Sequence, residues 1–525
     1  MKLPRAHHLS LQELAGQLIL PELTVEFLNR RSGELAELLR QMELLQPAGL
    51  ILRGNHPVDI RLRIEQIQQV VRFPLLLIAR PETGLQPAIP HTTLLPHFAA
   101  WGIVQDEDLV SEAARVVARE ARAVGLNTLF VPPLNPLPSA TGENELNSLS
   151  LQQEHVWSLS THIIRAVQQE GLLAIPYLLS TERNTPFPKD FSGLPLAEVH
   201  AFHYRYIATN LSEAQEASPS LPVRNWQQHG FRGLVITAVP FLLEEPADDT
   251  PLREALKAGM GPFTDSAHLT SSDSRRVYQR QEAATVFRAT SFRNRLVKLL
   301  QQDETAYRAA CRTVDTLFRI KKELHRHQPQ LPHFKRIYKI LQQPAHQNVA
   351  RKLTAGAVRL LHRKSHFRFQ PAAYQRIHHI PLTNPDISPA PFATLMQRLA
   401  DTNRSITTVS FDNLPEPETI RSPLPDLVIV SLHHTFEFRQ RCGLSRETLN
   451  RLLQSYLNAS VPVVLLLFGT PFQLRLFDFW KEVHAALVFF TDVPAAQHLA
   501  FDFIRGSIDL PPELPEVWQS AISRQ

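Results

Sequence analysis

Few residues of this chain have types and spacing that could do chemistry, and the first of them are two carboxylates. Glu82 lies just after an apolar run, 75–79, where a strand would present side chains at its carboxyl end. It could contact a ligand hydroxyl or pair with Arg80. Asp190 follows Lys189 in a polar loop and is either a catalytic carboxylate or a solvated loop residue. Two such groups facing each other would supply a nucleophile and a general acid/base.

Histidines are the next candidates. His200 and His203 in EVHAFHYR are spaced i, i+3, so on a helix they would share one face. Without a third ligand at suitable spacing, they do not predict a metal site. His433 follows an apolar run and could line a crevice, but on an extended chain His434 would point to the opposite face. The sequence has no glycine-rich phosphate loop and no G-x-S-x-G elbow. We therefore predict neither a metal nor a cofactor.

The bulk composition is that of an ordinary globular protein. A chain of 525 residues with 43% hydrophobic and 20% charged residues indicates two or three soluble domains. No signal peptide is seen, and no run reaches the roughly 18 apolar residues of a membrane helix. The two cysteines, Cys311 and Cys442, give no disulfide framework. We therefore expect a cytoplasmic protein without a membrane span.

A basic block lies between residues 271 and 380. It holds 23 Lys plus Arg against 6 Asp plus Glu, a net charge of +17, whereas the remainder holds 32 against 44, a net charge of −12. Within it Arg319, Lys322 and Arg326 follow i, i+3, i+7 spacing, which would place them on one helix face. Such a face either binds an anionic polymer or acidic protein surface, or is solvated and neutralised by the acidic flanks. No nucleic-acid-binding motif occurs, so nucleic acid is not predicted as a partner.

The first half of the chain alternates short apolar runs with amphipathic helices, a pattern typical of parallel α/β folds. Ser10 with Glu13, and Ser150 with Gln153, have the spacing of capping boxes at the starts of two helices. Apolar residues recur at helical spacing between residues 107 and 124. The predicted strands are 48–52, 75–79, 129–131, 172–175 and 234–237.

The second half begins with a basic helical segment, 275–327, and continues as another α/β region. The continuous apolar runs 425–432 and 461–468 predict two buried strands. Residues 446–458 have the pattern of a helix between them. We therefore predict that this region forms a second domain.

In this order, the segments resemble glycoside hydrolase family 3, the family of β-N-acetylhexosaminidases and β-glucosidases. LSLQELAGQLIL resembles the first helix of the family, and AREARAVGLNTLFVPPLNP resembles its segment "arelralGinlnfAPvlDv". GFRGLVITAVPF resembles its "GFdGlvitDaldM", and VPVVLLLFGTPFQL its "pvvvvlfGnPyal". The resemblance covers nearly the whole chain. It implies an N-terminal barrel, often irregular, followed by an α/β sandwich.

The resemblance also implies a site that has lost its catalytic groups. The aspartate nucleophile of the family corresponds to Ala238, and a methyl group cannot form the covalent intermediate of a retaining glycosidase. The sugar-binding "DqEGG" corresponds to Arg80-Pro81-Glu82-Thr83-Gly84, which keeps only the glutamate. The aspartate of "APvlD" becomes Asn135, and the substrate-binding Lys-His pair becomes Tyr177 and Leu178.

The acid/base is also missing from its expected loop. In the N-acetylhexosaminidase branch it is a His with a nearby Asp, whereas the loop STERNTPFPKDFSGLP has no His and has Asp190 near the place of the Asp. The stretch between residues 195 and 231 is shorter than the family usually shows. The resemblance therefore predicts that a strand carrying a substrate His is rebuilt or lost.

We predict an α/β fold with an irregular TIM-like barrel in residues 1–270, a basic helical connector in 271–335 and an α/β sandwich in 336–525. The predicted function is that of a catalytically inactive member of the family that binds a carbohydrate or protein partner. Two alternatives stay open. One is an active β-N-acetylhexosaminidase-like hydrolase of O-glycosidic bonds, acting in cell-wall or carbohydrate metabolism with relocated catalytic groups. The other is a polyanion binder that uses residues 271–380.

Overall fold

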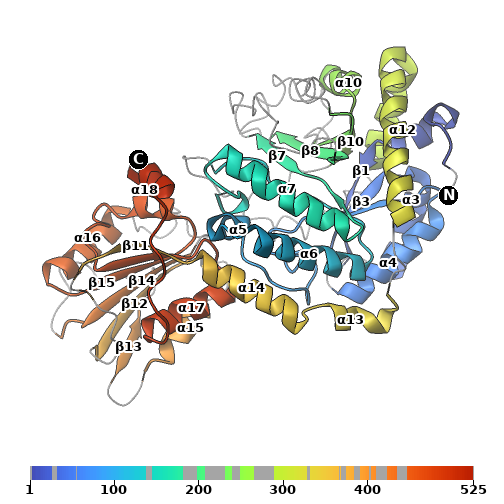
Figure 1. Cartoon of the computed structure of the whole chain (residues 1–525). Coiled ribbons are helices and arrows are strands. Elements are labelled where there is room, and N and C mark those ends of the chain that lie inside the picture. Colours follow the sequence, from blue (N-terminus) through green and yellow to red (C-terminus); the bar gives the residue numbers. More distant parts are fainter. Residues whose placement is uncertain are drawn as a thin grey trace. The chain divides into compact units, whose positions relative to one another are not determined.

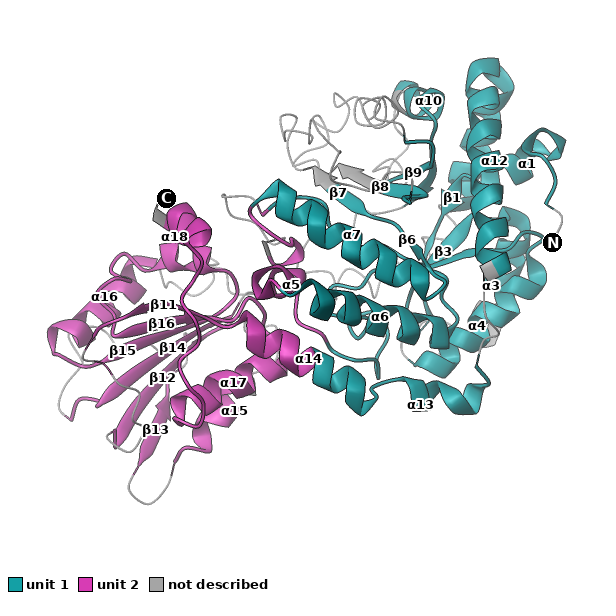
Figure 2. Cartoon of the chain, viewed as in Figure 1, with its two compact units in different colours: residues 1–94, 106–136, 152–349 teal, residues 95–105, 137–151, 350–525 magenta. Residues whose placement is uncertain are grey.

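The chain is described here from a computed structural model, in which the helices and strands follow the sequence from blue to red in Figure 1. The chain divides into two compact units, which are coloured separately in Figure 2. Unit 1 holds residues 1–94, 106–136 and 152–349, and unit 2 holds residues 95–105, 137–151 and 350–525. The residues that the structure describes are 3–25, 32–54, 56–137, 145–180, 198–206, 231–238, 249–264, 289–327, 332–365, 367, 374–383, 391–400, 404–409, 423–433 and 446–523.

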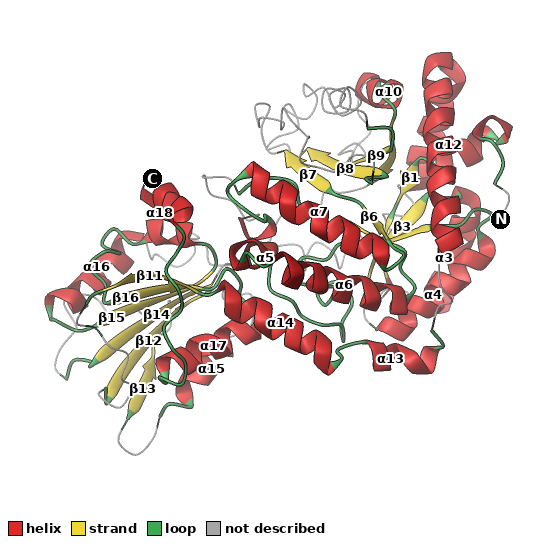
Figure 3. Ribbon diagram, viewed as in Figure 1, coloured by secondary structure: helices red, strands yellow, loops and turns green. Residues whose placement is uncertain are grey.

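Unit 1 is built on two parallel sheets, shown as yellow arrows in Figure 3. The first sheet has the strand order β2-β3-β4-β5-β6, and the second has the order β1-β10-β9-β8-β7. Strands separated by helices pair in parallel because the chain must return to the same end of the sheet. The bounds are β1 Ile19–Leu20, β2 Glu22–Thr24, β3 Gly49–Arg53, β4 Leu76–Ala79, β5 Thr128–Leu129, β6 Leu173–Ala174, β7 Tyr177–Ser180, β8 Ala201–Tyr206, β9 Leu234–Ala238 and β10 Met260–Thr264.

At two places the chain passes directly from one sheet of unit 1 into the other. Only Pro21 separates β1 from β2, and only Ile175 and Pro176 separate β6 from β7. Each junction holds a proline, which lacks the N–H that a continuous ladder needs, although the Pro21 carbonyl still accepts from Ile51 N at 3.0 Å. The ladders of the described residues thus do not close into one barrel sheet. A mixed α/β fold with parallel sheets is established, whereas the predicted barrel is not confirmed.

Helices connect these strands. In α6 the side chain of Asp106 caps the first turn by accepting from Leu109 N at 2.9 Å, and Gly125 ends the helix with a φ of 99°. One face of α6 is apolar and buried, and α6 packs against α7. The helical bounds are η1 Ala6–His8, α1 Leu11–Gly16, α3 Ser32–Leu45, α4 Pro57–Val70, α6 Glu107–Val124, α7 Gln153–Gln169, α10 Thr250–Lys257, 289–302, α12 Glu304–His327, η4 Phe334–Arg336, α13 Ile337–Ile340 and α14 Pro344–Ala357, the last of which runs past the end of unit 1.

Three predictions about local structure can be compared directly with unit 1. The capping box of α1 is confirmed, because Ser10 Oγ accepts from Glu13 N while Ser10 N donates to Glu13 Oε2. The second predicted box is wrong: α7 begins at Gln153, whose amide instead donates to the Leu134 carbonyl at 3.3 Å. The helix face predicted for His200 and His203 is also wrong, because this segment forms strand β8. Strand β8 lies within residues 195–231, the stretch in which the resemblance predicts a rebuilt or lost strand.

Unit 2 is built on a mixed sheet with the strand order β11-β16-β15-β14-β12-β13, in which only β11 is antiparallel to its neighbour. The predicted strands 425–432 and 461–468 appear as β14 and β15, and the predicted helix 446–458 appears as α16. The bounds are α5 Phe98–Val104, η2 Glu145–Asn147, β11 Arg359–Arg363, β12 Arg376–Leu382, α15 Pro391–Gln397, β13 Ser405–Thr408, β14 Leu427–His433, α16 Arg446–Asn458, β15 Val463–Phe468, η9 Pro471–Leu476, β16 Ala485–Val488, α17 Pro494–Ile504 and α18 Glu516–Ser523.

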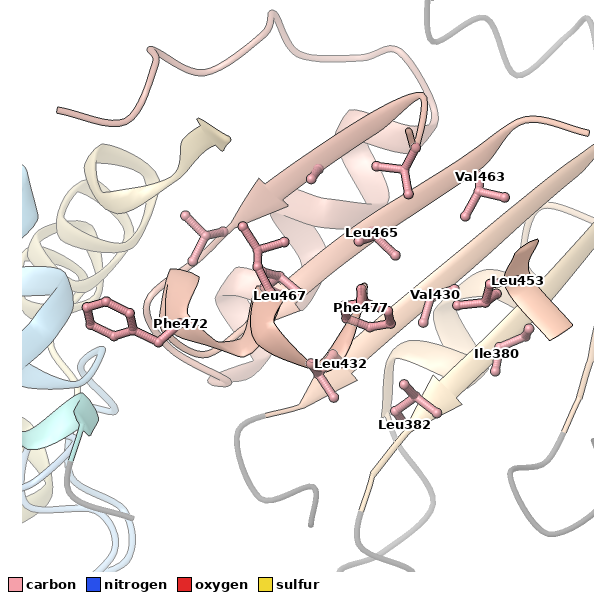
Figure 4. Packing of buried hydrophobic residues seen from close by; sticks show 14 of the residues in the cluster. Ile380, Leu382, Val430, Leu432, Leu453, Val463, Leu465, Leu467, Phe472 and Phe477 are labelled. Atoms are coloured by element: carbon pink, nitrogen blue, oxygen red, sulfur yellow. The ribbon is translucent and has the colours of Figure 1, made fainter. Parts of the chain in front are cut away.

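The core of unit 2 follows from side-chain alternation along β12, β14 and β15. Val463, Leu465 and Leu467 point to one face, where they join residues of the neighbouring strands and Leu453 of α16 in one buried cluster (Figure 4). The opposite face meets α15 and α17. Every residue of β15 is buried, which confirms that this continuous apolar strand is covered on both faces. None of the helices within the described residues is long and apolar enough to cross a membrane.

Candidate functional site

The carboxyl ends of the parallel strands of unit 1 are where a site is expected, because loops and side chains converge there in α/β folds. Ala238 is the last residue of β9, and its register partner on β10 is Thr264. Thr264 is fully buried, and its Oγ1 has no hydrogen-bond partner among the described residues. The strand that carries Ala238 therefore ends beside a neutral hydroxyl residue.

Arg80, Glu82 and Tyr177 come together at the carboxyl end of β4 and the start of β7. Arg80 directly follows β4, and its guanidinium carbon lies 5.3 Å from the centre of the Phe130 ring. Burial of the Tyr177 phenol raises its pKa, the negative charge of Glu82 raises it further, and the positive charge of Arg80 acts in the opposite direction. The three side chains are thus within electrostatic reach of one another. The Glu82 side chain itself is exposed.

Tyr177 is fixed through its backbone by the segment that carries Asn135. Its N–H donates to the Pro132 carbonyl at 3.0 Å, and its carbonyl accepts from Leu134 N at 2.9 Å. Asn135 is the next residue after Leu134 and is partly buried. Leu178 is 3% exposed and contributes an apolar side chain next to Tyr177. The positions that the resemblance assigns to sugar binding therefore hold one phenol, one amide and one aliphatic group.

The carboxylates of this region are few. Among the described residues in the first three positions after β2, β3, β4 and β5, Glu82 is the only acidic one. Asp190 lies outside the described residues. Within the same described part of the chain, no group of three or more His, Cys, Asp or Glu side chains could hold a metal ion. Among the described residues of this region, Glu82 is therefore the carboxylate that a hydroxyl-bearing ligand could contact.

The basic residues predicted on one helix face lie on α12, the long yellow helix of Figure 1. Arg319, Lys322 and Arg326 are all exposed there at the predicted spacing. Lys321, by contrast, is 2% exposed and donates to Gln17 Oε1 at 2.8 Å. Burial lowers the pKa of this ammonium. The basic block thus includes both an exposed row and a buried cation that anchors α12 to the segment before β1.

The sequence analysis missed a buried carboxylate on α6. Glu120 is 1% exposed; its Oε2 accepts from Thr93 N at 2.7 Å, and its Oε1 accepts from Thr93 Oγ1 at 2.6 Å and from Gln342 N at 2.9 Å. His346 Nδ1 lies 3.0 Å from the same Oε1. In sequence Glu120 looks like part of the solvated face of a helix, and only the chain-distant donors show its role. It joins three segments of unit 1 and is a structural group.

Comparison with known proteins shows which family part of this chain resembles. Residues 10–176 match the family model of the glycosyl hydrolase family 3 N terminal domain. A stretch of 131 residues is 27% identical to a beta-N-acetylglucosaminidase/beta-glucosidase of Cellulomonas fimi. That match covers 25% of this chain and 23% of the relative, so the alignment spans about a quarter of each protein.

Solved structures give the same picture over a longer part of the chain. A glycoside hydrolase family 3 beta-N-acetylglucosaminidase from Paenibacillus sp. str. FPU-7 is similar with a TM-score of 0.69 and 16% identity, over 96% of this chain and 99% of that one. A beta-glucosidase from Listeria innocua is similar with a TM-score of 0.65 and 14% identity, over 96% and 74%. At these identities the likeness concerns the fold. The resemblance carried by the motifs is therefore confirmed: residues 10–176 match the N-terminal domain of glycoside hydrolase family 3, and solved structures of that family share the fold over nearly the whole chain.

Proposed function

We propose that this chain is a catalytically inactive glycosidase-fold protein that binds a carbohydrate or a protein partner without hydrolysing it. The observation that carries the proposal is Ala238 at the carboxyl end of β9, which the resemblance assigns to the nucleophile of the family. A retaining glycosidase needs two carboxyl groups about 5–5.5 Å apart, one as nucleophile and one as acid/base. An alanine at the first of these positions removes covalent catalysis entirely.

The neighbouring positions also support the loss of catalysis. An arginine replaces the first aspartate of the sugar-binding motif, and its guanidinium lies over Phe130. Tyr177 and Leu178 replace a Lys-His pair that would hold substrate hydroxyls. One loss of function explains all three changes together, whereas a relocated mechanism requires several new groups to arise in concert.

The same residues can still bind. The exposed Glu82 carboxylate and the partly buried Tyr177 phenol offer hydrogen bonds to hydroxyl groups. We further propose that the two sheets of unit 1 correspond to one irregular barrel and that unit 2 corresponds to an α/β sandwich. The junctions at Pro21 and Pro176 support this, because the same chain segments continue from one sheet into the other.

The proposal is tested with purified protein and chromogenic β-N-acetylglucosaminide and β-glucoside. Hydrolysis should not exceed the buffer background. The Ala238→Asp variant should remain inactive as well, because an acid/base is still missing. Turnover by the wild-type chain that disappears in Glu82→Ala or Asp190→Ala would instead establish the alternative, an active hydrolase with relocated carboxylates.

A second candidate function is favoured by one observation on α12. Arg319, Lys322 and Arg326 are exposed in one row, which is the geometry a polyanion-binding face requires. This binding would not involve Ala238 or Glu82. Acidic residues of the same helix, such as Asp315 and Glu323, argue for a solvated face instead. A salt titration distinguishes polyanion binding from a solvated face.

A further inference from the structure

Two histidines and a tyrosine from three distant segments of unit 1 meet at its surface. His56 lies directly before α4, His91 lies in the chain after β4, and Tyr338 belongs to α13. The ring centres of His56 and His91 are 5.6 Å apart, those of His56 and Tyr338 are 5.6 Å apart, and those of His91 and Tyr338 are 6.3 Å apart. Each ring therefore neighbours both of the others.

This cluster is open to water. Tyr338 is 45% exposed, His91 is exposed and His56 is partly buried. The phenol oxygen of Tyr338 lies 2.6 Å from His56 Nε2 in an exposed contact. A small ion can therefore reach the polar atoms of these rings from solvent without any opening of the fold.

The buried carboxylate of Glu120 holds two of the three segments together. Thr93, two residues after His91, donates from its N–H to Glu120 Oε2 at 2.7 Å. Gln342, four residues after Tyr338, donates from its N–H to Glu120 Oε1 at 2.9 Å. The segment of His91 and the segment of Tyr338 are thus tied to one another through a single buried side chain.

His56 is fixed separately, at the start of α4. Its carbonyl accepts from Ile60 N at 3.0 Å, and Gly54 N donates to the Ala88 carbonyl at 2.8 Å, which joins the end of β3 to the segment that leads to His91. His91 has a φ of 64°, in the left-handed region that is uncommon for residues other than glycine. Such a conformation persists where the surrounding structure holds it, so the place of His91 is set by the fold.

The spacing of the rings fits one shared metal ion. A metal about 2 Å from an imidazole nitrogen lies roughly 3 Å from the ring centre, so two imidazoles on one ion have centres no more than about 6 Å apart. The 5.6 Å between His56 and His91 is within that limit. Two donor atoms on one ion lie about 3 Å apart, which is close to the contact between Tyr338 and His56. Small rotations of these side chains would admit the ion.

The charges around the cluster are mixed. The negative charge of Asp59 acts on the Tyr338 phenol and favours a cation there. Lys335, Arg336 and Lys339 are close to Tyr338 in the chain, but all three are exposed, so water and salt screen their charges. Neutral imidazoles present nitrogen lone pairs, which are ligands for a transition metal.

We propose that His56, His91 and Tyr338 bind a divalent transition-metal ion, with Cu²⁺ preferred, at the surface of unit 1. Each imidazole gives one nitrogen, the phenol gives its oxygen and releases its proton to water, and water completes the coordination. Among first-row divalent ions, Cu²⁺ binds nitrogen and oxygen ligands most tightly. This ligand set includes a phenol and so differs from a group of three His, Cys, Asp or Glu side chains, which the described part of the chain lacks. None of the three residues takes part in the function proposed above.

The test is a Cu²⁺ titration of the full chain, made without a histidine tag and freed of metal, with glycine as a competing ligand. The chain has 23 histidines, and glycine withholds the ion from those that stand alone. One equivalent of Cu²⁺ should bind, with an electron paramagnetic resonance spectrum that shows coupling to imidazole nitrogen. His56→Ala and His91→Ala should each weaken binding by at least about tenfold. His325→Ala removes an exposed imidazole of α12 and is the matched control, whose affinity should be unchanged.

Tyr338→Phe distinguishes a metal ligand from a packing group. The variant keeps the ring and removes only the oxygen, so Cu²⁺ should bind more weakly and without the visible charge-transfer absorption of a copper–phenolate bond. Urea unfolding of each metal-free variant shows that it is folded. His91→Ala, at an exposed position, suffices if His56→Ala does not fold.

Several results would overturn the inference. Equal Cu²⁺ affinity in the wild type, His56→Ala and His91→Ala would show that the ion binds elsewhere, and an equal loss in His325→Ala would show that the effect is not specific to the cluster. Failure of the wild-type chain to bind Cu²⁺ in competition with glycine would remove the site. Binding of inorganic phosphate in place of Cu²⁺, lost in His56→Ala and His91→Ala, would show an anion site instead.

Discussion

Ala238 and Thr264 are register partners at the carboxyl ends of two adjacent parallel strands, β9 and β10. The resemblance to glycoside hydrolase family 3 predicts a carboxylate at the first of these positions, whereas the two strands here end in a methyl group and a buried hydroxyl. Under the proposed function, the strand backbone that would position a nucleophile is kept and the carboxylate is lost. This separates the fold from its reaction, because a parallel sheet can persist when the side chains at its ends no longer catalyse.

The buried carboxylate of Glu120 should be essential to the stability of unit 1. In Glu120→Gln, an amide nitrogen would have to face a donor, either Thr93 or Gln342. We expect the free energy of unfolding to fall by roughly 3 kcal/mol, the cost of leaving buried donors without an acceptor. Urea unfolding measures this. Glu304→Gln, which breaks an exposed pair with Arg308, should change stability by less than about 0.5 kcal/mol, and equal losses in both variants would contradict the account.

The core of unit 2 should not tolerate a charge on β15. Leu465 is fully buried, so Leu465→Asp would bury an unpaired carboxylate and should prevent soluble expression. The matched control is Leu510→Asp, because Leu510 is 42% exposed and can keep a charge in water. Comparison of the soluble fractions after expression tests this. Soluble, folded Leu465→Asp protein would show that the strand is not covered as described.

The stability of the protein should fall on acidification because of His379. Burial, and then the nearby charge of His433, lowers the pKa of His379 to about 3. The folded state therefore binds fewer protons than the unfolded state below the ordinary pKa of histidine, near 6.5, and stability is lost as the pH falls from there toward 3. The slope attributable to this group approaches 1.4 kcal/mol per pH unit.

Urea unfolding between pH 7 and pH 4 measures that slope. His379→Phe should flatten it, because the variant has no imidazole to protonate on unfolding. His8→Gln removes an exposed imidazole and should leave the slope unchanged. Parallel pH profiles for the wild type and His379→Phe would contradict the assignment.

How much of this could be predicted from the sequence depends on the kind of element. The places of α6 and α16 were predicted correctly, because apolar periodicity and helix-end residues lie within the segment itself. Strands β8 and β10 were missed, since AFHYRY and MGPFT have no long apolar run and are specified by their neighbours in the sheet. Tertiary context overrides local propensity in such short strands.

The residues of the candidate sites also differ in whether the sequence could predict their roles. Ala238, Arg80 and Tyr177 could be picked out because a family motif supplies the expected residue at each place. Lys321 and Glu120 could not, because their partners lie 304 and up to 226 residues away in the chain. Which of several neighbouring cations is buried is decided by packing and is not visible in a charge count.

The exposed row on α12 provides a test of the basic block. If the row binds polyanions, the affinity for polyphosphate should fall steeply between about 50 and 200 mM salt, because counterion release drives such binding. The triple variant Arg319→Glu/Lys322→Glu/Arg326→Glu should bind more weakly and with less salt dependence. Arg308→Glu/Arg312→Glu, at exposed positions elsewhere on the same helix, is the control. Unchanged binding in the triple variant, or none in either protein at low salt, leaves a solvated face.

The most direct test of the central claim is to trap the covalent intermediate. A 2-deoxy-2-fluoro-β-glucoside with a good leaving group forms a slow-turnover glycosyl-enzyme with any retaining carboxylate nucleophile, and intact-protein mass spectrometry detects the added sugar. The account predicts that the wild-type chain gains no mass, because Ala238 provides no carboxylate at the nucleophile position. A stoichiometric adduct, mapped by peptide sequencing to Glu82, Asp190 or another carboxylate, would contradict it.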